Sequence, residues 1–168
     1  TLDIMRRAGI DVKTVSISDT LSVTGAHGVT VTADLLFNEA NVSEAKWLIL
    51  PGGMPGASNL AAFEPLSKLI VEHNHKKGLI AAICASPAVV LAPLGVLKDK
   101  EAICYPGFEE HFKDSKPGLS PVVIDENIIT ANGPATVFKF ALAIVTHTLG
   151  EEKAYEVAEG LLLYPQHQ

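Results

Sequence analysis

Uninterrupted apolar runs, and apolar residues spaced three or four apart, divide this chain into alternating strands and helices. Trp47–Leu50 and Leu79–Ile83 have the length and character of strands buried on both faces. Helical spacing follows each run and dominates the last third of the sequence. It predicts helices over Asn59–Lys77, Ala85–Leu94, Pro134–Leu149 and about Glu151–Leu162. The residues expected to face the core from the third helix are Phe138, Leu142, Val145 and Leu149.

Weaker signals predict shorter strands. These are Asp11–Ser18, Val29–Thr32, Glu101–Cys104, Val122–Ile124 and Ile128–Thr130. Between the last two lies Asp125-Glu-Asn127, a run of turn residues that indicates a hairpin. Strands that alternate with helices predict an α/β sandwich around a mainly parallel sheet. Ligands of such folds bind beyond the carboxyl ends of the strands, where this chain has Pro51-Gly-Gly53 and Cys84.

The sequence begins inside a predicted helix. Thr1–Gly9 has the character of last helical turns, with two arginines near the end and a C-terminal glycine. Because a fold of this class is expected to begin with a strand, a strand, its loop and the first helical turns are expected before this helix. Together they would be on the order of 15–20 residues. We therefore interpret residues 1–168 as a single domain that is incomplete at its N-terminus.

Composition narrows the possible functions. A formal net charge of −6 with only two arginines argues against a nucleic-acid partner. No apolar run approaches the ~20 residues of a membrane-spanning helix, which argues against a membrane partner. Two cysteines are too few for a disulfide scaffold and favour a reducing, cytoplasmic location. No group of potential ligands has metal-binding spacing, so we expect no metal.

Cys84 is the main candidate for chemistry. It lies between a predicted buried strand and a predicted helix, flanked by small residues, as in a nucleophile elbow. A helix N-terminus favours the thiolate, which is the reactive form of the side chain. The alternative is an inert cysteine that packs as a small hydrophobic residue. We give Cys104, inside a predicted strand, this inert interpretation.

Two glycines and two histidines complete the local candidates. The backbone N–H groups of Gly52 and Gly53 could form an oxyanion pocket, although a loop that needs positive φ would also require glycine. A thiolate enzyme needs an acid or base nearby. His27 and His111 lie in predicted loops and are available, but neither belongs to a motif. His73 is expected to be solvated at a charged helix end.

Several segments in one order resemble a known family. They are Asp3-Ile-Met-Arg-Arg-Ala-Gly9, Leu50-Pro-Gly-Gly53, Lys77-Gly-Leu-Ile-Ala-Ala-Ile-Cys84-Ala, Gly133-Pro134 and Phe140-Ala-Leu-Ala-Ile-Val145. Together they are similar to the DJ-one branch of the ThiJ/PfpI superfamily over nearly the whole chain. The resemblance implies a flavodoxin-like three-layer α/β sandwich, a homodimer, and activity that needs no cofactor.

The same resemblance assigns roles to individual residues. Cys84 matches the family's reactive, easily oxidised cysteine. Gly52 and Gly53 match the loop that faces this thiol, with the Ala85 N–H as a further donor. Pro134 matches a segment that the partner subunit brings near the site. Arg7 and His27 fall where the family lines the pocket rim and the dimer interface.

The chain differs from the family pattern at two positions that would take part in proton transfer. The branch places a histidine before a proline after the cysteine helix, where this chain has Tyr105-Pro106. Tyrosine donates hydrogen bonds but is a poor base at neutral pH, which weakens a Cys–His mechanism. The family's acidic partner is a glutamate upstream of the segment at Asp3, so it would precede Thr1. No other carboxylate matches its position.

The activities implied are glyoxalase conversion of methylglyoxal to lactate and deglycation of early adducts, both dependent on Cys84. A non-enzymatic oxidative-stress sensor or redox-regulated chaperone would use the same cysteine. Other superfamily branches are peptidases with a histidine directly after the cysteine, and Ala85 at that position argues against peptidase chemistry. An inactive α/β domain is a further alternative.

Overall fold

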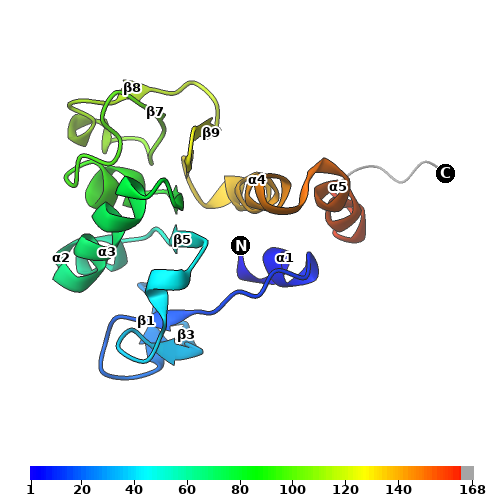
Figure 1. The fold of residues 1–168 in the computed structure, drawn as a ribbon, viewed down its shortest axis with the longest axis horizontal. Coiled ribbons are helices and arrows are strands. Elements are labelled where there is room, and N and C mark those ends of the chain that lie inside the picture. The colour runs from blue at the N-terminus through cyan, green and yellow to red at the C-terminus, as the bar shows by residue number, and fades with distance from the viewer. Residues whose placement is uncertain (164–168) are drawn as a thin grey trace.

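A computed structural model describes residues 1–163. Its centre is a four-stranded sheet in the order β5-β6-β10-β9, formed by Trp47–Leu50, Leu79–Ile83, Ile128–Ala131 and Val122–Asp125. β5, β6 and β10 run parallel, and β9 returns antiparallel to β10. The strands predicted from the two apolar runs and the hairpin predicted at Asp125-Glu-Asn127 are thus confirmed. Helices cover both faces of this mainly parallel sheet (Figure 1).

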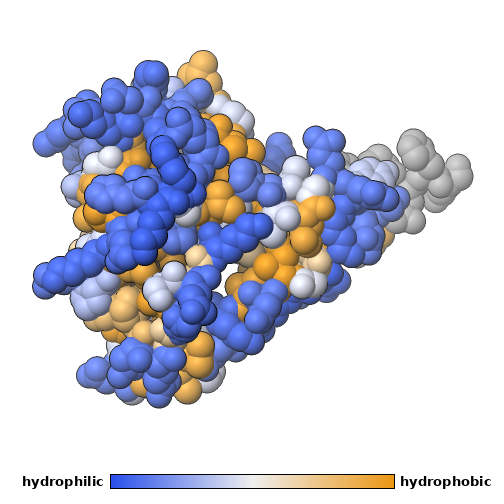
Figure 2. Space-filling view, in the orientation of Figure 1, coloured by the Kyte–Doolittle hydropathy of each residue, from blue (hydrophilic) through white to orange (hydrophobic). Residues whose placement is uncertain are grey.

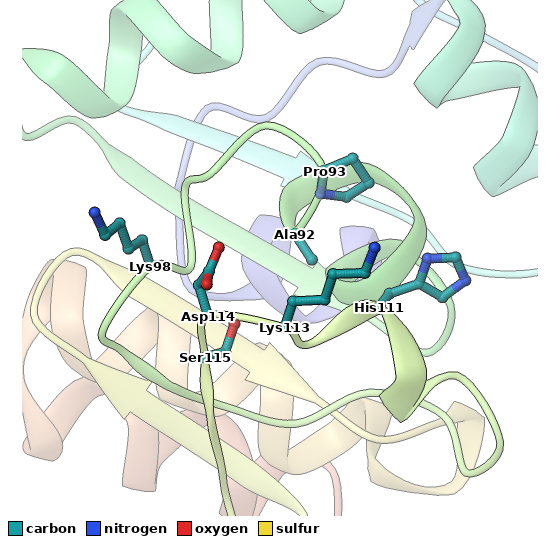
Figure 3. A pocket seen from close by; sticks show the side chains of 7 residues that line it. All are labelled: Ala92, Pro93, Lys98, His111, Lys113, Asp114 and Ser115. Atoms are coloured by element: carbon teal, nitrogen blue, oxygen red, sulfur yellow. The ribbon is translucent and has the colours of Figure 1, made fainter.

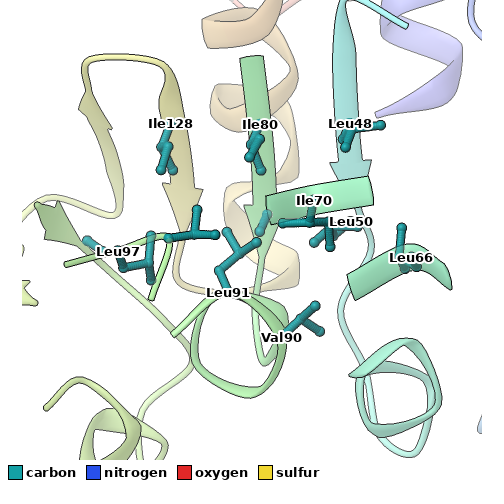
Figure 4. Close-up of a cluster of buried hydrophobic side chains, with 12 residues drawn as sticks. Leu48, Leu50, Leu66, Ile70, Ile80, Val90, Leu91, Leu97 and Ile128 are labelled. Atoms are coloured by element: carbon teal, nitrogen blue, oxygen red, sulfur yellow. The ribbon is translucent and has the colours of Figure 1, made fainter. Parts of the chain in front are cut away.

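The pleat of β6 shows how the layers form, because its residues alternate between the two faces. Ile80 and Ala82 pack into a cluster with α3 (Glu64–His75) and η2 (Pro87–Leu91) (Figure 4). Ala81 and Ile83 pack on the opposite face with α1 (Leu2–Arg7) and α4 (Val137–Leu149). The sheet is therefore the middle of three layers.

Smaller pairings surround this core. β1 (Val15–Ser16) pairs in parallel with β4 (Leu35–Leu36), and β7 (Glu101–Ala102) with β8 (Lys116–Pro117). β2 (Ser22–Thr24) and β3 (Thr30–Thr32) form an antiparallel hairpin. The short 3-10 segments are η1 (Val42–Glu44), η3 (Glu109–His111) and η4 (Pro134–Thr136).

The strand predicted over Asp11–Ser18 is wrong in length, because only Val15–Ser16 forms a ladder. Side chains supply the hydrogen bonds on either side of it. Thr14 donates its backbone N–H and its hydroxyl to the Asp34 carboxylate, at 2.7 and 2.9 Å. Such local side-chain bonds compete with a regular strand.

The helix predicted over Asn59–Lys77 is two helices, α2 (Gly56–Ala62) and α3. Pro65 lacks the N–H that would continue the first helix and its ring would clash with the preceding turn, so the chain becomes extended at Phe63 and restarts. The helix predicted over Ala85–Leu94 is the π-turn η2, closed by the Ala92 N–H on the Pro87 carbonyl at 3.0 Å.

The core face expected for α4 is wrong at both ends. Phe138 and Leu149 are 44% and 47% exposed. α4 is buried on two sides, because Phe140 and Ile144 face the sheet while Ala141 packs against α1 and α5 (Glu151–Gly160). A helix packed between a sheet and other helices buries residues on two sides, so a single apolar stripe does not predict its buried residues.

His73 also differs from expectation, since it is buried rather than solvated. Its Nε2 lies 3.1 Å from the Leu79 carbonyl oxygen, and its ring fills the space beside Gly78. Burial of this histidine therefore joins the end of α3 to the start of β6.

No helix within residues 1–163 is both long enough and apolar enough to cross a bilayer.

Candidate active site

Cys84 lies at the carboxyl end of β6, on the sharp turn into η2. Its φ is +65°, a left-handed conformation that is uncommon for residues other than glycine. The backbone holds it there, because the Cys84 N–H donates to the Ala131 carbonyl at 2.8 Å and the Cys84 carbonyl accepts from the Tyr105 N–H at 2.9 Å. The thiol is half-buried. A strained backbone that is fixed on both sides is typical of functional sites.

The glycine loop after β5 lies directly against this thiol. A Cβ built on Gly52 would come 2.4 Å from the Cys84 Cβ and 3.2 Å from its Sγ. Only glycine permits this approach. Gly53 is required for a different reason, because its φ of +86° is a left-handed conformation with open space around the α-carbon. Positive φ therefore accounts for Gly53 and close approach to the thiol accounts for Gly52, while an oxyanion pocket formed by their N–H groups stays a prediction.

The two residues that directly follow Gly52 and Cys84 in the chain have unpaired backbone donors in the described structure. Within residues 1–163 the N–H groups of Gly53 and Ala85 donate no hydrogen bond, although Ala85 is only 2% exposed. A buried N–H without a partner is costly and therefore rare. Such donors next to a nucleophile can bind an oxyanion or an oxidised sulfur.

Sequence reasoning missed Ser86, which joins the two halves of the site. This serine is fully buried, and its hydroxyl donates to the Pro51 carbonyl at the start of the glycine loop. The available signal was a small hydroxyl residue two positions after the candidate nucleophile. The sequence does not show which segment lies beside Ser86, so the hydrogen-bond partner of its hydroxyl could not be predicted.

Tyr105 and the start of η4 form the opposite side of the site. The Tyr105 ring lies over Gly133, where an added Cβ would be 3.5 Å from the ring. The ring is also edge-on to Phe108, with centroids 6.4 Å apart. Pro134 follows Gly133 and is exposed. Since β10 ends at Ala131, beside the Cys84 N–H, these residues lie on the β10 side of the thiol and Gly52 on the β5 side.

Neither Arg7 nor His27 makes a hydrogen bond or ion pair with Cys84. Arg7 is exposed at the end of α1, where its Nε donates to Asp3 at 2.7 Å. His27 is exposed at the tip of the β2–β3 hairpin. His111 lines a cavity of about 290 Å³ formed with Pro93, Lys113 and other residues, none of them in the thiol site (Figure 3). His167 lies outside the described residues.

Cys104 is buried, as expected for a cysteine that packs as a small hydrophobic residue. It is 2% exposed, and burial raises the pKa of its thiol to about 12, with smaller contributions from the negative charges of Glu109 and Cys84. The protonated thiol is a poor nucleophile. Across residues 1–163 no three His, Cys, Asp or Glu side chains are grouped to hold a metal ion.

The match to known proteins covers most of the chain, since residues 1–147 match the DJ-1/PfpI family. The chain belongs to this family. Over 165 residues, 98% of this chain, it is 36% identical to "Protein DJ-1 homolog B" of Arabidopsis thaliana. It is also 33% identical to the Caenorhabditis elegans "Glutathione-independent glyoxalase DJR-1.2", covering 97% of this chain and 87% of that protein.

Solved DJ-1 structures share the fold. "Toxoplasma gondii DJ-1, oxidized" superimposes with a TM-score of 0.91 at 38% identity, covering 96% of this chain and 88% of the other. The flavodoxin-like sandwich implied by the resemblance is thereby confirmed. The chain spans only 38% and 42% of the length of the two Arabidopsis relatives, whereas it spans 87% of the worm DJ-1 relative.

Proposed function

We propose that this protein is a cofactor-free, cysteine-dependent enzyme that converts reactive dicarbonyls such as methylglyoxal to hydroxy acids such as lactate. The observation that carries the proposal is the left-handed Cys84, held against Gly52, with unpaired N–H groups on the adjoining residues Ala85 and Gly53. The name of the worm relative, a glutathione-independent glyoxalase, supports the same chemistry. A reactive free thiol and a buried free thiol fit the reducing cytoplasm, which is the location we propose.

The reaction balances without an oxidant or reductant. The Cys84 thiolate attacks the aldehyde carbon of methylglyoxal and forms a carbon–sulfur bond, while the carbonyl oxygen gains negative charge. The Gly53 and Ala85 N–H groups bind this oxygen. An acid/base group then moves the proton from the former aldehyde carbon to the neighbouring ketone carbon. The oxyanion re-forms a carbonyl, and the former ketone oxygen takes up a proton from solvent, which gives a lactate thioester. Water cleaves the carbon–sulfur bond and releases lactate and the free thiol.

Tyr105 suits a substrate-positioning role better than a basic one. Its ring rests on Gly133 and narrows the β10 side of the site, which favours small substrates. Its hydroxyl makes no hydrogen bond to any residue in 1–163 and can donate to a substrate oxygen. In deglycation, the same groups would hold an early glyoxal adduct of a thiol or amine while it is released as a hydroxy acid. Pro134, beside Gly133, would contribute to the same wall.

The test is lactate formation from methylglyoxal by wild type, Cys84→Ser and Cys104→Ala. We expect Cys84→Ser to lose turnover by a factor on the order of 10³ or more, and Cys104→Ala to retain it because that thiol is protonated and buried. Unchanged lactate formation by folded Cys84→Ser would show that this thiol is not the nucleophile.

A second candidate is an oxidative-stress sensor or redox-regulated chaperone. One structural neighbour carries the word oxidized in its name, and the N–H groups around Cys84 could equally hold the oxygens of a sulfinic acid. Intact mass after mild peroxide distinguishes the two. Oxygen added at Cys84 with no lactate formed in the turnover assay would favour the sensor.

We also propose that a second copy of this chain is its partner. The β2–β3 hairpin has one apolar and one polar face. Val23 is paired with Val31 on the apolar face, and Thr24 is paired with Thr30 on the polar face. Its apolar face is open to solvent, with Val29 and Val31 67% and 59% exposed. Apolar surface is visible near the position of β3 in Figure 2. His27 and Arg7, which make no recorded contact with Cys84, would belong to this interface.

A further inference from the structure

Ser86 is the residue whose side chain connects the nucleophile turn to the glycine loop. It follows Cys84 by two positions, is fully buried, and donates its hydroxyl proton to the carbonyl of Pro51, thirty-five residues earlier in the chain. Within residues 1–163 no other side-chain hydrogen bond joins these two segments. The donor end of this bond is in the core, because Ser86 is 0% exposed, whereas Pro51 is exposed at the start of the glycine loop.

The loop needs such an anchor because it is built from the most flexible residue type. Its distal end is fixed, since the Gly53 carbonyl accepts from the Ala57 N–H at the start of α2, at 2.8 Å. Its proximal end is fixed at Pro51 by Ser86. Between the two anchors lie Gly52, in contact with the thiol, and the unpaired Gly53 N–H. Releasing one anchor would let glycine sample many backbone conformations.

We propose that Ser86 is a positioning residue, which holds the Pro51–Gly53 loop so that the Gly53 N–H faces an anion formed at Cys84. It acts through the loop and does not itself touch the substrate. The inference rests on the proposed function for its effect on turnover. The arrangement of the N–H groups around the thiol, however, can be measured without turnover.

If Ser86 only stabilised the fold, its replacement would affect stability alone, as expected for another buried serine. Ser16 is also a buried serine, 3% exposed, whose hydroxyl is 2.9 Å from that of Ser18, far along the chain from the thiol. Ser16→Ala therefore serves as the matched control, since it also removes one hydroxyl from a buried position. Both variants are expected to lower stability to a similar extent. Only Ser86→Ala is expected to alter the chemistry of Cys84.

The turnover-independent readout is the ratio of two alkylation rates at Cys84. Iodoacetate carries a carboxylate that organised N–H donors attract, whereas iodoacetamide of similar size is neutral. We expect Ser86→Ala to lower the iodoacetate-to-iodoacetamide ratio several-fold and Ser16→Ala to leave it unchanged. With methylglyoxal, Ser86→Ala should lower kcat by about ten-fold to a hundred-fold, with KM changed by less than about two-fold.

A second pair of variants covers the case in which Ser86→Ala does not fold. Ser86→Thr and Ser86→Val have the same shape and differ in the hydroxyl, so their stability cost from added volume is shared. Threonine should keep the wild-type alkylation ratio and valine should lose it. Equal ratios in the threonine and valine variants, or a Ser86→Ala ratio equal to wild type, would overturn the proposal. Absence of turnover in the wild type would refute the proposed function alone, because the alkylation ratio would still decide the role of Ser86.

Discussion

Replacing Gly52 by alanine would place a methyl group inside the thiol site. The new Cβ would lie 2.4 Å from the Cys84 Cβ and 2.7 Å from the Ile83 carbonyl oxygen. Neither atom belongs to a flexible side-chain end, because one is fixed by the backbone of the turn and the other is backbone itself. The loop must therefore move.

The size of that movement follows from the distances. Ordinary van der Waals contact begins at 3.4 Å, so the loop must withdraw by 3.4 − 2.4 = 1.0 Å from Cys84. A displacement of about 1 Å in a catalytic group can cost roughly a hundred-fold in rate. Overpacking of this kind costs about 1–3 kcal/mol of stability. We expect Gly52→Ala to fold, with turnover of methylglyoxal reduced about a hundred-fold.

The matched control is Gly56→Ala, because Gly56 lies at the start of α2, has no neighbouring atom within 4 Å of an added Cβ and does not have positive φ. It should retain turnover and gain a little stability, since alanine is the better helix former. Lactate formation and urea unfolding curves of both variants make the comparison. Wild-type turnover in Gly52→Ala would refute the view that the loop is packed against the thiol for catalysis.

Four further predictions follow from named contacts. In native protein at pH 8, iodoacetamide should label Cys84 and leave Cys104 unlabelled until denaturant is added, as peptide mass spectrometry would show. Because the pKa of Cys104 is raised to about 12 in the folded state, the unfolded chain releases this proton first. Stability should then fall as pH rises above about 9, and less steeply in Cys104→Ala. Tyr105→Phe should raise KM for methylglyoxal about three-fold to ten-fold by loss of one hydrogen bond, with Tyr155→Phe on α5 as control; an unchanged KM would exclude the phenol from substrate binding. Val31→Lys should convert a dimer to a monomer in light scattering, whereas Thr30→Lys on the polar face of the hairpin should not, and a monomeric wild type would contradict the proposed partner.

The central sheet was predictable because its signals are local. Trp47–Leu50 and Leu79–Ile83 are apolar without interruption, and the Asp125-Glu-Asn127 turn fixes the β9–β10 pairing in sequence. α4 shows the limit of such reasoning. Its apolar spacing fits several faces, and the correct one depends on α1, α5 and the sheet, which are partners from distant parts of the chain.

The candidate site divides in the same way. A cysteine between a strand and a helix and two consecutive glycines after a strand are visible in the sequence, and the structure places Cys84 and Gly52 in contact. Ser86 could not be found because its meaning depends on Pro51, which only the β5–β6 pairing brings close. His27 lies in a loop as predicted, but that loop is the tip of a solvent-exposed hairpin, and His27 makes no hydrogen bond or ion pair with Cys84.

A single-turnover experiment tests the central claim, that Cys84 becomes covalently bound to the substrate. Wild-type protein in excess over methylglyoxal would be quenched at successive times and digested, and the peptide containing Cys84 would be weighed by mass spectrometry. We expect an adduct of one methylglyoxal on this cysteine that disappears as lactate appears, at the same rate. Lactate that forms without any such adduct, or forms equally in Cys84→Ser, would contradict it.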